Sequence, residues 1–212
     1  PQFHVPKEVP STFYPSHLLL GQDRVVNSFK LMSKLSGQHF FLADFPGIDR
    51  VDFIEALCSQ VDTPTDQFLV ATKPAEETAV TFKWQPQRPP ENVGTIAKQQ
   101  SLFCYLQGQI KRNDLLGKMQ KTDKSSQYKA GALASNHFVF ICLHSIWKRE
   151  GLWELLLQIL SDGEYRINQE LAPIPVNCKI ILVGSGLSYS HLKNEDRFFS
   201  QHFPLLGEIS YE

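Results

Sequence analysis

The chain has 212 residues, 42% of them hydrophobic and 20% charged, and its formal net charge is −1. This is the composition of an ordinary globular protein, long enough to bury a substantial apolar core. The near-neutral charge gives no global sign of binding to nucleic acid, to a membrane surface or to an acidic partner.

The cysteines and the apolar runs predict a cytoplasmic protein. Four cysteines are widely spaced without a CxxC pair, and three of them lie in apolar runs, which predicts buried free thiols in a reducing compartment. No apolar run approaches the ~20 residues of a membrane span, and no signal peptide is visible. Because the chain begins at Pro1 without Met and ends at Glu212 without a polar tail, we expect a fragment of a longer protein.

The first third of the chain predicts two helices that flank a buried strand. Four prolines in the first 20 residues favour an arm that packs on the domain. Apolar residues then follow helical spacing up to Gly37, which is placed to end the helix. In chain order we expect an arm over residues 1–20, a helix over 22–36, a strand over 39–43, a turn over 44–49 and a helix whose apolar face runs from Phe53 to Val61.

The middle of the chain predicts a hairpin, a long helix and a polar loop. Two alternating runs, 68–71 and 79–84, favour a hairpin, and a proline-rich connector follows them. Apolar residues spaced three to five apart indicate a long helix over about 94–120. The polar segment 121–129 then predicts a mobile loop.

The last third of the chain alternates strands with helices. The expected elements are a buried strand over 138–143, a helix over 152–160 capped by Gly163, an edge strand over 164–168, a buried strand over 178–183 and a helix over 190–203 with a Ser N-cap. Strands that alternate with helices predict a mostly parallel sheet covered on both faces.

The turn after the first strand occupies the position of a phosphate-binding loop (P-loop). Such a loop reads G-x-x-x-x-G-K-[ST]: glycines let backbone N–H groups surround phosphates, Lys bridges the terminal phosphates, and the hydroxyl holds Mg²⁺. Here aspartates replace both end glycines, Arg replaces Lys, and Val replaces the hydroxyl residue, so an ordinary strand-to-helix turn is the alternative interpretation. The frame is Asp44, Phe45, Pro46, Gly47, Ile48, Asp49, Arg50 and Val51.

Two later strand ends complete the comparison with an ATPase. An ATPase ends its second core strand in Asp-Glu, to hold the metal shell and to activate water. The corresponding pair here is Cys142-Leu143, and neither residue does that chemistry. At the end of the strand over 178–183, Ser185 is a candidate remnant of a polar γ-phosphate sensor.

Several blocks of sequence, in the right order, resemble the AAA+ module of Lon-related proteases. Gly21-Gln22-Asp23-Arg24 resembles the family's opening "GQxR" block, and Gly131-Ala132-Leu133 resembles its "GAL" before the second core strand. The remaining blocks are 37–50, 151–167, 173–184 and 196–203. The resemblance covers residues 15–212.

This resemblance implies an α/β, P-loop NTPase-like fold, the large subdomain of an AAA+ module. It divides the chain into an N-terminal arm over 1–20 and a degenerate AAA+-like domain over 21–212, with a hairpin and helical insertion at about 62–133. It also implies a parent Lon-type serine endopeptidase, whose Ser–Lys dyad belongs to a protease domain outside this chain, an oligomer, and unfolded proteins as substrates. Insertions of this kind are expected to touch the substrate.

The departures from the family fall at the nucleotide-handling positions. The resemblance therefore leads us to expect an assembly and substrate-admission domain that neither hydrolyses ATP nor carries a catalytic residue, a cofactor or a metal. Two alternatives stay open: a degenerate AAA+ scaffold in DNA metabolism, similar to clamp-loader subunits, and a live ATPase with an odd loop.

Two further clusters have ordinary explanations. Cys142 and His144 lie two apart on an expected strand, and a packed pair is favoured over a metal site because no second ligand pair is evident. A solvated helix face is favoured over nucleic-acid contact for a basic stretch that lacks interleaved aromatic residues. That stretch comprises Lys111, Arg112, Lys118, Lys121, Lys124 and Lys129.

Overall fold

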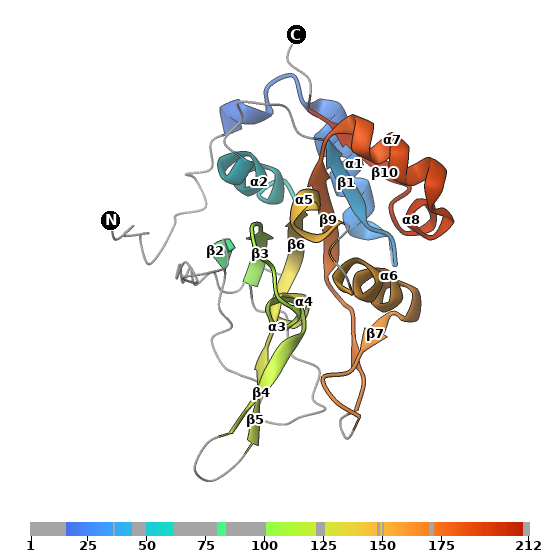
Figure 1. Ribbon diagram of the computed structural model, residues 1–212. Coiled ribbons are helices and arrows are strands. Elements are labelled where there is room, and N and C mark those ends of the chain that lie inside the picture. Colours follow the sequence, from blue (N-terminus) through green and yellow to red (C-terminus); the bar gives the residue numbers. More distant parts are fainter. Residues whose placement is uncertain are drawn as a thin grey trace.

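A six-stranded sheet organises the chain in the computed structural model (Figure 1). The structure describes residues 16–35, 37–43, 50–61, 80–83, 101–121, 126–147, 149, 151–169 and 172–209. The strand order is β10–β1–β9–β6–β3–β2, parallel throughout except for the antiparallel pair β2–β3 at one edge. The bounds are β1 Phe40–Ala43, β2 Val80–Lys83, β3 Ser101–Leu106, β6 Asn136–Cys142, β9 Lys179–Gly184 and β10 Leu205–Glu208.

Helices cover both faces of this sheet, as the sequence predicts. They are α1 Asp23–Lys34, α2 Arg50–Cys58, α3 Arg112–Leu116, α4 Ala132–Ser135, α5 Leu143–Ile146, α6 Leu152–Asp162, α7 Gly186–Glu195 and α8 Arg197–His202, with a 3-10 helix, η1, over Ser16–Leu19. Helices α1 and α2 and the 3-10 helix η1 pack on the face that carries Phe40, Leu42 and Phe140. The other helices pack on the face that carries Phe41 and Ile141.

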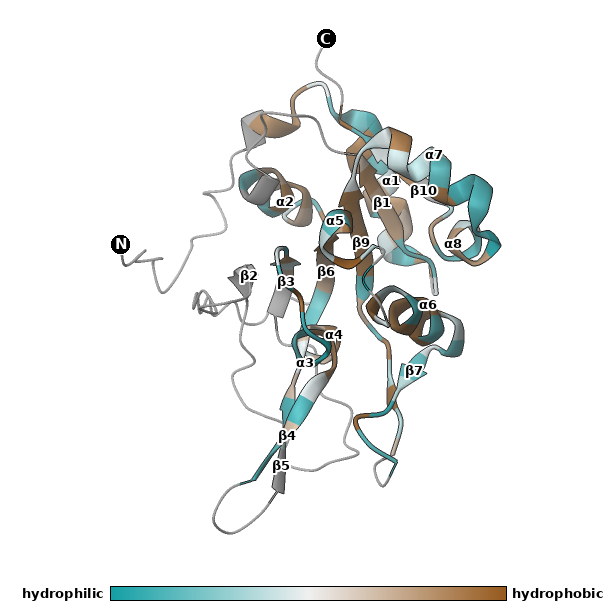
Figure 2. Ribbon diagram, viewed as in Figure 1, coloured by the Kyte–Doolittle hydropathy of each residue, from teal (hydrophilic) through white to brown (hydrophobic). Residues whose placement is uncertain are grey.

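The strands are apolar on both faces because both are covered. Every residue of β1 is buried, and so are all of β6 except His137. Figure 2 shows the central strands in hydrophobic colours, whereas the carboxyl-terminal part of α7 is hydrophilic. Continuous apolar runs of this kind are typical of parallel strands between two helix layers.

Two small antiparallel pairs stand beside the main sheet. Strands β4 (Gly117–Lys121) and β5 (Ser126–Ala130) form a hairpin that projects away from α1 and α7 (Figure 1). Strands β7 (Glu164–Tyr165) and β8 (Ile174–Pro175) form the second pair. The Tyr128 hydroxyl donates a hydrogen bond of 2.6 Å to the Leu116 carbonyl and lies 3.4 Å from the Tyr165 hydroxyl. These buried contacts hold the base of the hairpin against the domain.

The prediction of a long helix over 94–120 is wrong. Strand β3, helix α3 and strand β4 occupy 101–121 instead. Phe103 and Tyr105 pack on the α1–α2 side of the sheet, whereas Cys104 and Leu106 pack on the other side. A strand buried on both faces is a continuous apolar run, which periodicity alone does not separate from a buried helix. Strand β3 lies within the region expected as an insertion, yet it pairs in the main sheet.

Other expected boundaries also change. The segment 121–129 is not all loop, because Ser126–Ala130 pairs with β4. The single helix over 190–203 is two helices: α7 takes Ser185, not Ser190, as its N-cap, and α8 begins after Asp196. The Asp196 carboxylate accepts hydrogen bonds from the N–H groups of Phe198 and Phe199, which starts a new helix there. The edge strand over 164–168 is only two residues long.

The remaining elements agree with the sequence where the structure describes them. Helix α1 buries Val25, Phe29 and Met32, and α6 ends at Gly163, whose φ of 70° is left-handed. Residues 1–15 of the expected arm and the run 68–71 lie outside the described residues; β2, from the second run, pairs with β3. Among the helices that the structure describes, none is long and apolar enough to cross a membrane.

His39 lies buried at the amino ends of β1 and β9. Its Nδ1 accepts a hydrogen bond of 3.0 Å from the Ile180 N–H. Burial, followed by the nearby charges of Lys179 and His202, lowers the pKa of His39 from 6.5 to about 3. The folded state therefore holds this imidazole neutral.

We expect the free energy of unfolding to fall as the pH drops below about 6.5, because unfolded His39 binds a proton that folded His39 rejects until about pH 3. The stabilisation that the neutral His39 contributes is complete above the pKa of His39 in the unfolded chain. Below that pKa it is lost by up to about 1.4 kcal/mol per pH unit. Urea unfolding of the wild type and of His39→Asn, whose amide oxygen can accept the same hydrogen bond, measures it between pH 7.5 and 5. If the free energy of unfolding fell equally steeply with pH in the two proteins, the result would contradict a neutral buried imidazole.

Candidate functional site

The carboxyl ends of four parallel strands meet at one edge of the main sheet. Strand β1 ends at Ala43, which lies opposite Gly184 of β9 on one side and Glu208 of β10 on the other. Cys142 at the end of β6 lies opposite Val183. The three sequence-predicted positions that the structure can place, the ends of β1, β6 and β9, therefore come together at this edge.

The strand order makes this edge a ligand-binding position. From β1 the chain crosses to β2 and then β3, which lie beyond β9. From β9 it crosses to β10, which lies on the opposite side of β1. Adjacent strands whose connections leave in opposite directions open a crevice between them, and ligands of open α/β sheets bind there, outside the carboxyl ends of the strands. Ala43 and Gly184 mark this switch point.

The predicted loop itself, Asp44–Asp49, lies outside the described residues. Strand β1 ends immediately before it, and α2 begins immediately after it. Helix α2 starts at Arg50, and nothing is described of the side chains of Arg50 and Val51. A strand and a helix in the predicted order therefore flank the loop, and its own path stays a prediction.

Leu143 is the residue that the sequence predicts at the position of an ATPase's water-activating carboxylate. Its side chain is fully buried, and a Cβ added at Gly184 would lie 3.1 Å from Leu143 Cδ2. Cys142 is buried as well. A hydrocarbon side chain packed against the neighbouring strand provides neither a metal ligand nor a general base.

Ser185 lies at the end of β9 as the N-cap of α7. Its Oγ accepts a hydrogen bond of 3.1 Å from the Ser188 N–H and lies 2.9 Å from the Ser188 Oγ. The side chain is exposed. Ser185 thus satisfies the helix terminus, which accounts for its presence without a phosphate.

Glu208 is a residue of this edge that the sequence analysis missed. A Cβ added at Gly186, the first residue of α7, would lie 3.1 Å from Glu208 Oε1. The carboxylate therefore lies beside the positive end of the α7 dipole, which favours a negative charge. The signal in the sequence is the apolar run Leu205-Leu206 before Gly207-Glu208, which resembles a short buried strand that ends in an acid.

Phosphate binding sets chemical requirements with which the described side chains of this edge can be compared. Phosphate binding needs cations and free N–H groups, and Mg²⁺ needs oxygen ligands. The groups placed here are the buried Cys142 and Leu143, the capping hydroxyl of Ser185 and the carboxylate of Glu208. A carboxylate at the α7 terminus repels a polyphosphate.

The Cys142–His144 pair does not share one strand. Strand β6 ends at Cys142, and His144 lies in α5 with an exposed side chain. The expectation that the two residues lie on one face of a strand is therefore wrong, because the helix begins at Leu143. Across the residues with described positions, no group of three or more His, Cys, Asp or Glu side chains is arranged to hold a metal.

The fold and this edge define a P-loop NTPase-like α/β domain, with the parallel sheet and switch point of that class. The family model described as "LonB-like, AAA domain" matches residues 91–210, more than half of the 212 residues. The chain therefore belongs to the LonB-like AAA domain family, which confirms the resemblance to Lon-related AAA+ modules. Comparison with curated proteins found no match.

Comparison with solved structures found matches of low sequence identity. NtrX from Brucella abortus matches with a TM-score of 0.52 and 10% identity over 89% of this chain and 35% of that one. An ATPase described as putative from Cytophaga hutchinsonii matches with a TM-score of 0.47, 13% identity and coverages of 95% and 53%. A full-length MCM homologue from Methanopyrus kandleri matches with a TM-score of 0.44, 13% identity and coverages of 99% and 42%. The chain spans about half or less of the length of each.

Proposed function

We propose that this AAA+-like domain does not hydrolyse ATP and that it serves assembly and substrate admission in a Lon-related protease. The observation that carries the first half is the position of Leu143, fully buried against Gly184 where catalysis needs an exposed carboxylate. The sequence of the loop supports it, because Asp44 and Asp49 would face the phosphates.

We expect millimolar ATP–Mg²⁺ to leave the melting temperature of the purified chain unchanged, because the groups that hold phosphate and metal are replaced. A ligand present at 100 times its Kd stabilises a protein by about 2.7 kcal/mol. In a domain of this size such stabilisation raises the melting temperature by several degrees. Differential scanning fluorimetry with ATP–Mg²⁺, ADP–Mg²⁺ and Mg²⁺ alone measures it. A reproducible rise with ATP–Mg²⁺ but not with Mg²⁺, or a micromolar calorimetric isotherm, would reject the proposal.

The β4–β5 hairpin supports the second half of the proposal. It projects from the domain (Figure 1), and its base is held by Tyr128. Lys118, Lys121 and Lys129 on it are exposed. A rigidly based, exposed hairpin is suited to contact a polypeptide that passes the domain. In the parent protein, a protease domain of the same polypeptide and further copies of this domain are the partners that the proposal requires.

A degenerate AAA+ scaffold in DNA metabolism is the second candidate, and the exposed lysines of the hairpin are the observation that favours it. They offer a positive surface to a phosphate backbone, although nearby aromatic stacking groups were not recognised in the sequence.

Photo-crosslinking separates these two functions. With a photoreactive residue at Lys121, we expect the chain to capture unfolded casein, because this position lies far out on the hairpin. The matched site Lys193, exposed on α7, should capture little. Single-stranded DNA captured at Lys121 in place of casein would favour the scaffold, and equal capture at both sites would remove the argument from the hairpin.

A further inference from the structure

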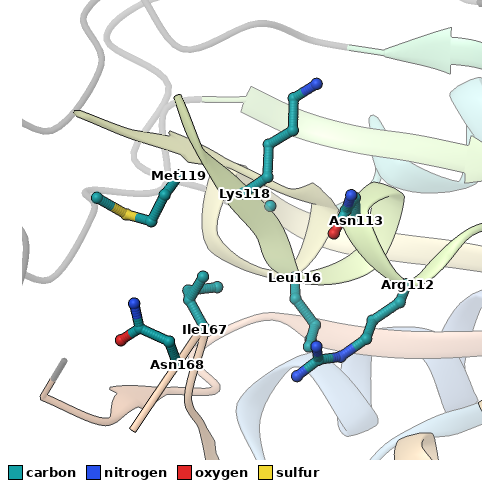
Figure 3. Close-up of a pocket in the computed structure, with 8 residues that line it drawn as sticks. Arg112, Asn113, Leu116, Lys118, Met119, Ile167 and Asn168 are labelled. Carbon is teal, nitrogen blue, oxygen red and sulfur yellow. The ribbon is translucent and has the colours of Figure 1, made fainter. Parts of the chain in front are cut away.

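A pocket of about 230 Å³ lies at the base of the hairpin (Figure 3). It is formed where β4 meets α3 and the turn that follows β7. Sites for small molecules have volumes of about 300–1,000 Å³. The pocket is therefore sized for one or two side chains of a larger ligand.

Two cationic residues, Arg112 and Lys118, stand among the apolar residues that line the pocket. Leu116 is buried, and Met119 and Ile167 pack partly buried against the core. Arg112 is exposed beside Leu116, whereas the Lys118 side chain extends away from the other lining groups (Figure 3). The residues that line the pocket include no carboxylate. The charge that complements this site is negative, and the surface beside it accepts an aliphatic group.

The pocket also lies against β4, of which three consecutive residues, 117–119, line it. Within the described ranges, β4 pairs only with β5. The outer edge of a strand presents alternate N–H and C=O groups, which an extended polypeptide can pair with.

We propose that this pocket binds an extended polypeptide segment in which an acidic side chain neighbours an aliphatic one. The aliphatic side chain packs among Leu116, Met119 and Ile167, and the carboxylate accepts hydrogen bonds from the Arg112 guanidinium, which matches carboxylates with two parallel donors. This inference rests on the proposed role of the hairpin in substrate admission and names the kind of segment that the domain selects.

Fluorescence anisotropy with labelled unstructured peptides tests the inference on the full chain. The parent peptide carries Leu-Glu-Leu in a Gly-Ser background, and two companions replace Glu by Gln or both Leu by Ser. We expect the parent to bind about fivefold more tightly than the Gln peptide and at least about tenfold more tightly than the Ser peptide. In Arg112→Gln, the parent and Gln peptides should bind equally well, and the Ser peptide should still bind more weakly. In Met119→Ser, the parent should lose its advantage over the Ser peptide and keep its advantage over the Gln peptide.

Lys129→Gln is the matched control, because Lys129 is exposed on the same hairpin, opposite Lys118, and does not line the pocket. It should change each affinity by less than about twofold. Equal affinities for the three peptides, or an equal loss in Lys129→Gln and Arg112→Gln, would overturn the inference. A different outcome would reject the pocket alone. The wild type would bind the three peptides equally, and casein capture at Lys121 would persist in Arg112→Gln and in Met119→Ser. The proposed function would then stand without this binding site.

Discussion

The Leu143→Glu variant should unfold at a much lower urea concentration than the wild type, because its free energy of unfolding falls by at least about 4 kcal/mol. The side chain is fully buried against Gly184, so a carboxylate there loses its hydration. The apolar packing of Leu143 is lost as well. Far-UV circular dichroism during urea titration measures the midpoint and the slope.

Leu143→Met is the matched control, since it keeps the volume and the apolar surface and should cost less than about 1.5 kcal/mol. The contrast decides between two views of this position. If Leu143→Glu costs no more than Leu143→Met, the side chain has an open environment that accepts the carboxylate of an ATPase. The proposal of a non-hydrolysing domain would then lose the observation that carries it.

Gly117→Ala should loosen the base of the hairpin and cost about 3 kcal/mol or more. Gly117 has φ of +86°, and an added Cβ would lie 2.2 Å from the Lys129 carbonyl oxygen and 2.6 Å from the Gly131 nitrogen. Both neighbours are backbone atoms, so the two strands must separate to make room. Gly131 faces the same contact, because its own added Cβ would lie 2.2 Å from the Gly117 nitrogen.

Gly151→Ala isolates the effect of close packing. Gly151 also has positive φ, +75°, but an added Cβ meets no atom within 4 Å. Only the left-handed backbone conformation therefore lowers the free energy of unfolding, by about 1–2 kcal/mol. Thermal unfolding gives the global loss for both variants. Hydrogen exchange of the amides in 117–121 and 126–130 should rise only in Gly117→Ala. Similar losses and unchanged exchange would mean that the two strands do not approach each other as closely as described.

The sequence predicts which strand ends form the candidate site, but not every residue that lies beside them. The ends of β1, β6 and β9 were expected to carry the nucleotide-handling residues, because each follows a buried apolar run, and the fold brings these ends together. Glu208 was missed, since its proximity to α7 depends on β10 pairing with β1 across 165 positions of sequence (208 − 43). No local pattern reports such a pairing.

The sequence by itself determined the parallel α/β class and the family resemblance, because buried strands, helix faces and caps such as Gly163 are local patterns of residue type. Only the tertiary structure decided that 101–106 is a strand: Phe103 and Cys104 are both buried because helices cover both faces of the sheet, and a helix would present the same apolar run. It likewise decided that Leu143 closes against Gly184 and that β4 pairs with β5 to project a hairpin. The physical reason is that burial and strand pairing join residues far apart in the chain, whereas propensity and periodicity act over only a few neighbours.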